Sequence, residues 1–156
     1  MKLDNAKRAG IIKLIYMLVP LVVVFMAASA YMYYDAKDLR YMVFAFVGLL
    51  FFFLVMSIIK YSYIIFYAGP DKITIRFKAL SPFNTPSNSV QIKTDEFKDY
   101  KIKTSIFGIK KTLYLFQQTP SGLAKYPGIG LSALNNDEID KLKKAFELIL
   151  ALNKNN

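Results

Sequence analysis

The sequence predicts a membrane-anchored α+β protein, in which a two-helix transmembrane hairpin precedes a small antiparallel β-sheet that is closed by a C-terminal helix. Three observations lead to this fold class. Two long runs without charge lie in residues 1–60, alternating apolar and polar residues follow them, and residues 136–152 repeat with helical spacing. The composition agrees, because 54% of the 156 residues are hydrophobic and the mean hydropathy is +0.30, above the range of ordinary soluble domains.

The two runs without charge have the length of membrane-spanning helices. As helices, residues 14–34 would measure about 31 Å and residues 41–59 about 28 Å, close to the thickness of a hydrocarbon core. Residues 35–40 are highly charged and too few to return across the bilayer, so we expect a tight turn there. Residues 1–60 are therefore predicted to form a transmembrane hairpin, and residues 61–156 a separate domain.

Basic residues gather on the two outer flanks of this hairpin. They are Lys2, Lys7, Arg8, Lys13, Lys60, Lys72, Arg76 and Lys78. In the connecting turn, two basic residues are offset by two aspartates. Because basic flanks are retained in the cytoplasm, we expect a multi-pass protein of the inner (cytoplasmic) membrane with both its N-terminus and its C-terminus in the cytoplasm.

A cleaved signal peptide is the competing interpretation of the N-terminal segment. Residues 1–8 would be its basic region, and residues 28–30 match the small-residue pattern of a cleavage site. The apolar stretch is long for a signal peptide, however, and Lys13 interrupts its start. Cleavage would also send a basic domain outward, so we favour a transmembrane helix.

The domain after the hairpin begins with patterns that are typical of strands. Residues 72–78 alternate strictly between apolar and polar side chains, which is the period of a half-buried strand. Residues 61–68 are aromatic and β-branched, and the turn residues 69–71 follow them, so the two segments are predicted to form a β-hairpin. The alternative is that residues 61–67 extend the second helix.

Further strands are expected beyond a proline-containing loop at residues 81–88. The predicted strands cover residues 90–93, 100–106, 111–117 and 123–131. Gly108 marks one turn, and Pro127 and Gly128 should break or bulge the last strand. Because the connections are short, we expect an antiparallel sheet.

The C-terminal segment has the pattern of an amphipathic helix over residues 136–152. Its apolar residues recur at helical spacing, with charged residues opposite them. Asn135 is placed to cap the helix with Glu138 three residues later, and Leu134 and Ile139 are placed as a hydrophobic staple. We expect the apolar stripe to pack across an open end of the sheet.

The order of these elements resembles that of bacterial pleckstrin-homology-like domains appended to small membrane proteins, including the YcxB-like group. Two local phrases look similar as well: FKDYKIKTSIFG at residues 97–108 and KYPGIGLSAL at residues 125–134. The resemblance implies a bent antiparallel sheet capped by a helix and a binding or scaffolding role. It brings no catalytic residues with it.

Basic residues on the polar sides of the predicted strands are the candidate binding site. They are Arg76, Lys78, Lys101, Lys103, Lys110 and Lys111. On adjacent strands they would form one patch for anionic lipid head groups or for a protein partner. A solvated lysine-rich face is the alternative. Nucleic acid is not expected as a partner, because neither an RNA-binding signature nor a recognition-helix motif accompanies the charge.

The residues needed for catalysis are scarce in this chain. The sequence has no histidine and no cysteine, so it offers no ligand set for zinc or for an iron–sulfur cluster, and we expect no cofactor and no metal. The predicted function is therefore that of a non-enzymatic membrane protein that binds lipid, a protein partner or its own copies. An accessory or regulatory subunit of a transporter or channel is the alternative.

Overall fold

The computed structural model describes residues 1–33, 40–80, 86–105 and 108–155. The helices in this part of the chain are α1 (Ala6–Tyr33), α2 (Arg40–Ile59) and α3 (Asn136–Asn155). The strands are β1 (Lys2–Asp4), β2 (Ser62–Ala68), β3 (Lys72–Ala79), β4 (Ser87–Lys93), β5 (Phe97–Ser105), β6 (Lys110–Thr119), β7 (Gly122–Lys125) and β8 (Ile129–Gly130). This is the α+β arrangement that the sequence predicts, with one additional strand at the N-terminus.

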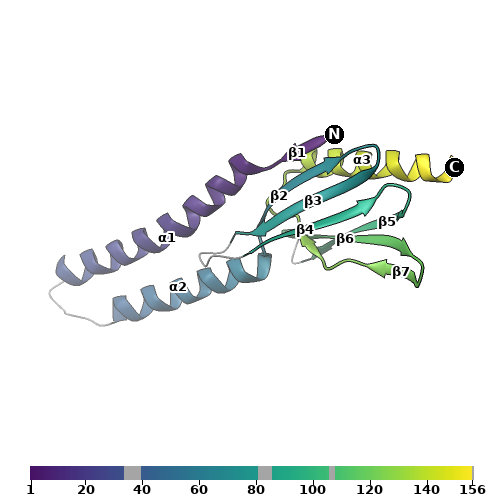
Figure 1. Cartoon of the computed structure of the whole chain (residues 1–156). Helices are drawn as coiled ribbons and strands as arrows, with labels where there is room; N and C mark the ends of the chain where they lie inside the picture. Colours follow the sequence, from purple (N-terminus) through teal and green to yellow (C-terminus); the bar gives the residue numbers. More distant parts are fainter. Residues whose placement is uncertain (34–39, 81–85, 106–107, 156) are drawn as a thin grey trace.

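The helices α1 and α2 lie side by side and project away from the sheets (Figure 1). Both are long and apolar enough to cross a membrane. In each helix, 6% of the most apolar window is buried inside the chain, whereas a core helix of a soluble protein is mostly buried. The hairpin therefore exposes an apolar surface that the rest of the described chain does not cover.

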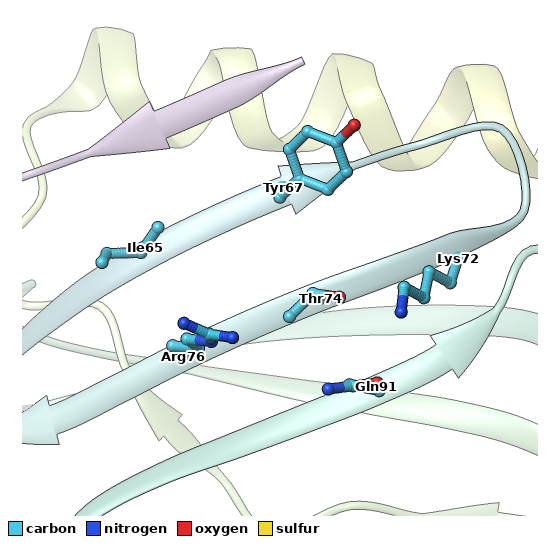
Figure 2. A pocket seen from close by; sticks show the side chains of 6 residues that line it. All are labelled: Ile65, Tyr67, Lys72, Thr74, Arg76 and Gln91. Atoms are coloured by element: carbon cyan, nitrogen blue, oxygen red, sulfur yellow. The ribbon is translucent and has the colours of Figure 1, made fainter.

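The first sheet, called sheet A, has the strand order β1-β2-β3-β4, with every pair antiparallel. Residues 62–68 are its second strand and do not extend α2, because the helix ends at Ile59 and Lys60 takes a left-handed conformation with φ of 55°. Ile64, Phe66 and Ile75 face the core. The alternate side chains of β2, β3 and β4 form the outer face (Figure 2).

The second sheet, called sheet B, has the order β5-β6-β7, and β8 pairs with the other end of β6. The predicted strand over residues 123–131 is thus divided into β7 and β8, with Pro127 and Gly128 between them. Gly108 has a φ of 86°, as its place in the predicted turn requires. Leu113 and Leu115 of β6 are fully buried against the inner residues of sheet A, so the two sheets enclose one core.

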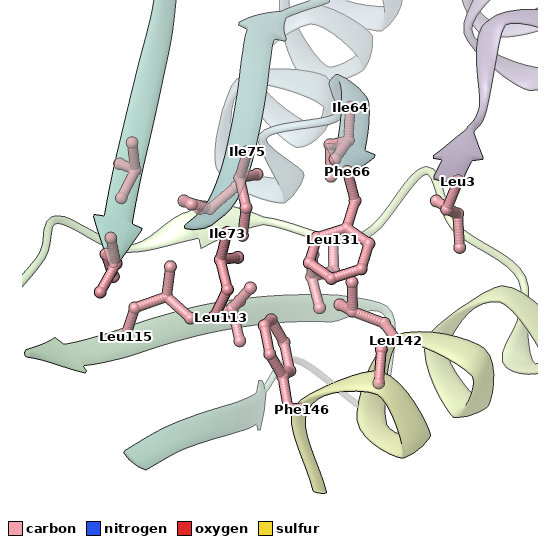
Figure 3. Packing of buried hydrophobic residues seen from close by; sticks show 14 of the residues in the cluster. Leu3, Ile64, Phe66, Ile73, Ile75, Leu113, Leu115, Leu131, Leu142 and Phe146 are labelled. Carbon is pink, nitrogen blue, oxygen red and sulfur yellow. The ribbon is translucent and has the colours of Figure 1, made fainter. Parts of the chain in front are cut away.

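The helix α3 packs on this core through Phe146 (Figure 3). The ring of Phe146 lies 5.4 Å from Phe66 of sheet A, and 5.4 Å and 4.8 Å from Phe97 and Tyr100 of sheet B. One aromatic side chain therefore joins the helix to both sheets, as expected for the apolar stripe of an amphipathic helix.

The predicted N-terminal cap of α3 is confirmed. The backbone N–H of Glu138 donates to Oδ1 of Asn135 at 2.6 Å, and the backbone N–H of Asn135 donates to Oε2 of Glu138 at 2.7 Å. This reciprocal pair is a capping box. Leu134 and Ile139, the predicted staple, are both buried.

The N-terminal strand β1 was not predicted from the sequence. It pairs with β2, so that Leu3 lies opposite Phe66, and residues 6–59 are inserted between two neighbouring strands of one sheet. Where β1 ends, the side chain of Asn5 continues the ladder: its amide donates to the carbonyl of Ser62 at 3.1 Å and accepts from the N–H of Ile64 at 2.8 Å. Both ends of the helical hairpin are thereby fixed to sheet A.

Candidate functional site

The six predicted basic residues do not lie on adjacent strands. Arg76 and Lys78 belong to β3 of sheet A, whereas the other four belong to β5 and β6 of sheet B. The sheets face each other across the core, so their outer faces point away from each other. The expectation of one patch on neighbouring strands is therefore wrong, because alternation identifies the face of a strand but not the sheet to which the strand belongs.

The side chain of Lys111 points to the opposite face of β6 from the side chain of Lys110. It follows Lys110 directly, and successive side chains of a strand point to opposite faces. Its Nζ donates to Oδ1 of Asn136 at 2.8 Å, and its backbone N–H donates to Oγ of Ser132 at 3.2 Å. Lys111 therefore holds the start of α3.

Lys101 and Lys103 lie on the outer face of sheet B. In the register of β5 and β6 they are opposite Tyr114 and Thr112. By alternation Lys110 shares this face with Thr112 and Tyr114. Lys125 of β7 is a further cation on it, because its Nζ lies 4.3 Å from the centre of the Tyr114 ring. Such a contact is a cation–π interaction of about 0.5–1 kcal/mol at an exposed site. One cation of this face, Lys125, is thus engaged by an aromatic ring.

The outer face of sheet A carries a shallow groove with a volume of about 270 Å³ (Figure 2). Its lining residues come from three neighbouring strands and are Ile65, Tyr67, Lys72, Thr74, Arg76 and Gln91. Thr74 stands between Tyr67 and Gln91 in the strand register, and Arg76 stands opposite Ile65. The groove thus combines two cations with hydroxyl, amide and aromatic groups, which is a donor-rich surface for an anionic group.

The electrostatics of this groove leave its two cations uncompensated. Lys72 lies directly opposite Lys93, and like charges in that position destabilise a sheet. Lys93 is paired with Glu96 at 3.2 Å, but among the described residues neither Lys72 nor Arg76 forms an ion pair with a carboxylate. A bound acidic group would therefore relieve repulsion as well as gain hydrogen bonds.

A second and larger cavity, of about 820 Å³, lies where the helical hairpin meets the sheets. It lies between the C-terminal half of α2, Tyr16 of α1, the end of β3 and the segment around β8. The glycine at position 130 is required here, since a Cβ would stand 2.4 Å from the carbonyl oxygen of Lys60. We call this space the junction cavity. No pattern in the sequence indicated it, because its walls come from four distant segments.

Metal and acid–base chemistry have little support in this structure. The described residues contain no group of three or more acidic side chains that could hold a metal ion. Both carboxylate oxygens of Glu96 have partners in the fold. Its Oε2 accepts a hydrogen bond of 2.6 Å from Nε2 of Gln117, and its Oε1 forms the ion pair with Lys93.

Comparison of the chain with protein-family models, with curated proteins and with solved structures finds no match.

Proposed function

We propose that this protein is a non-enzymatic protein of the bacterial inner membrane that holds a pleckstrin-homology-like binding or scaffolding domain at the cytoplasmic surface. The hairpin of α1 and α2 is its anchor. Sheets A and B with α3 are the domain. The groove on the outer face of sheet A is the surface that we assign to its partner, a protein with an exposed acidic segment.

The pairing of β1 with β2 is the observation that carries this proposal. The two strands flank the hairpin and are hydrogen-bonded neighbours, so α1 must start and α2 must end on the same side of any membrane that they cross. The basic residues Lys7, Arg8, Lys13 and Lys60 flank this end of the hairpin, which favours the cytoplasmic side. Removal of residues 1–30 as a signal peptide would delete β1, and this argues against cleavage.

The arrangement of the domain supports a binding role of the pleckstrin-homology-like kind. Two antiparallel sheets around one core, with a C-terminal helix packed on them, agree with the layout that the resemblance implies. The absence of histidine and cysteine from the sequence argues against an enzyme of the common hydrolytic classes.

The position of the groove favours a protein partner over the lipid of the same membrane. β2 leaves the end of α2 and runs away from the hairpin (Figure 1). With a rise of about 3.3 Å per residue, Ile65 and Tyr67 lie about 10 Å and 17 Å beyond Ser62. Electrostatic attraction to lipid head groups is screened within about 8 Å at physiological salt, so Lys72 and Arg76 lie beyond its useful range.

The topology can be tested with single cysteines, since the chain has none. Ala36→Cys lies between the two helices in the sequence, and Lys98→Cys lies at an exposed position of β5. An impermeant thiol reagent should label the first in intact cells and the second after lysis. Labelling of position 98 in intact cells would contradict the cytoplasmic domain.

The partner can be tested with a photo-crosslinking residue in place of Gln91 in the groove. We expect an adduct with an acidic protein that is lost in the double variant Lys72→Gln, Arg76→Gln and kept in the control Lys98→Gln. The same residue in place of Phe44, an exposed position of α2, tests the alternative role. An adduct with a transporter or channel from position 44, and none from position 91, would favour an accessory subunit.

A further inference from the structure

We propose that the junction cavity binds one anionic phospholipid, with the phosphate at Lys60 and an acyl chain between α2 and the end of β3. This inference rests on the proposed insertion of the hairpin into a membrane, and it assigns a second ligand to the protein, distinct from the partner at the groove. The cavity volume of about 820 Å³ is in the range of sites for drug-sized ligands.

One wall of the junction cavity is a single face of α2. Phe53, Met56 and Ser57 of α2 line it, and their spacing of three and four residues places them on one side of the helix. Lys60, which directly follows the last residue of α2, lines the cavity as well. Along this face the side chains change from apolar to hydroxyl to cationic toward the helix end. That is the order in which an acyl chain, a glycerol ester and a phosphate occur in a phospholipid.

The opposite wall provides matching chemistry. Phe77 and Leu80 lie at the end of β3 and supply apolar surface, and Asn88 of β4 supplies an amide beside them. Tyr16 of α1 lines the cavity on the side of the hairpin. Its ring makes an edge-to-face contact with Phe52, with ring centres 6.2 Å apart. The cavity is therefore amphipathic, with its polar groups on the side of the domain.

The depth of the junction cavity selects a membrane lipid as its occupant. Phe53 precedes the last residue of α2 by six positions, which is about 9 Å along the helix. Since α2, at 20 residues and about 30 Å, is about as long as a bilayer core is thick, this level lies inside the hydrocarbon region when the helix spans the membrane. A water-soluble ligand would not reach it, whereas a lipid of the same leaflet enters from the side.

The charge around the cavity selects an anionic lipid. Between residues 6 and 33, and again between residues 40 and 60, the sequence contains basic residues and no acidic ones. In the part of the chain that the structure describes, Lys60 has no ion pair with a carboxylate. Its Nζ is therefore available for a phosphate that carries no compensating headgroup amine.

The experiment uses the full chain, reconstituted with equal amounts of phosphatidylglycerol and phosphatidylethanolamine and then analysed by native mass spectrometry. We expect one phosphatidylglycerol to be retained, about fivefold more often than phosphatidylethanolamine, which corresponds to about 1 kcal/mol from one nearby cation. Equal retention of the two lipids by the unmodified chain, or retention of neither lipid, would by itself overturn the proposal.

Two variants and one control locate the site. Lys60→Asn removes the cation but keeps a residue that tolerates the left-handed conformation, and it should abolish the preference. Ser57→Phe fills the cavity and should reduce retention of both lipids. The matched control is Lys13→Asn, which removes a cation of the same flank that does not line the cavity and should leave the preference unchanged. An unchanged preference in Lys60→Asn would also overturn the assignment.

Extraction with alkaline carbonate distinguishes failure of the proposed membrane anchor from failure of the lipid site alone. If alkaline carbonate released the protein from membranes, the hairpin would not be inserted and both proposals would fail. An integral protein without a lipid preference would overturn only the lipid site.

Discussion

Replacement of Asn5 by alanine should test how the hairpin is attached to sheet A. The Asn5 side chain is 2% exposed and forms two hydrogen bonds with β2, donating to the carbonyl of Ser62 and accepting from the N–H of Ile64. Alanine can make neither bond. The substitution therefore leaves one carbonyl and one N–H of β2 without their partners at the point where β1 has turned into α1.

The expected cost follows from these two orphaned groups. A buried polar group that loses its partner costs about 1–3 kcal/mol, so two groups cost about 2–6 kcal/mol. The lower part of this range, about 2–3 kcal/mol, applies here because β1 is the outer strand of sheet A, where water can reach the vacated space. For a chain of this size such a loss corresponds to a Tm lower by roughly 4–12 °C.

Thermal unfolding of the full chain in detergent, followed by circular dichroism, measures this loss. The control is Ser89→Ala at an exposed position of β4, which should shift the free energy of unfolding by no more than about 0.5 kcal/mol. Hydrogen exchange should show faster exchange of the Ile64 amide in the Asn5 variant alone. Equal melting temperatures for the two variants would refute the reasoning, because the side chain would then contribute nothing to the ladder.

Two further predictions concern α3. Phe146→Ala should destabilise the protein by about 3–5 kcal/mol in the same melt, because it empties a site shared by both sheets, whereas Leu148→Ala, at a position 67% exposed, should change little. Burial, together with the Glu147 carboxylate to which its hydroxyl donates at 3.3 Å, raises the pKa of Tyr100. The folded chain therefore holds this proton more tightly than the unfolded chain, and the resulting stability is lost as the pH rises above about 10. Tyr100→Phe should show a smaller loss over that range, and an identical decline in both proteins would contradict the assignment.

Local patterns were sufficient for the elements that depend on neighbouring residues. The capping box of Asn135 and Glu138 involves residues three positions apart, and the hairpin of β2 and β3 needs only alternation and the turn at residues 69–71. The strand β1 has no such signal. It is three residues long, and Leu3 finds its partner Phe66 across the entire helical hairpin.

The predicted grouping of the six basic residues on adjacent strands was wrong for a related reason. Period-two alternation correctly places Arg76 and Lys101 on solvent-facing sides of their strands, but it does not say that β3 and β5 belong to different sheets. The same alternation, applied to Lys110 and Lys111, would have shown that these neighbours cannot share a face. The junction cavity needs side chains from α1, α2 and β3 together, and this assembly is a property of the tertiary structure alone.

The insertion of the hairpin between β1 and β2 also determines when the domain can fold during synthesis. β1 leaves the ribosome before either helix, but its partner strand is completed only at Ala68. At about 5–20 residues per second, β1 waits roughly 3–13 s as an unpaired segment while α1, α2 and β2 are made. A chain that inserted one helix and not the other would leave β1 and β2 on opposite sides of the bilayer. With the hairpin in a membrane as proposed, sheet A can close only when both helices span the bilayer or neither does.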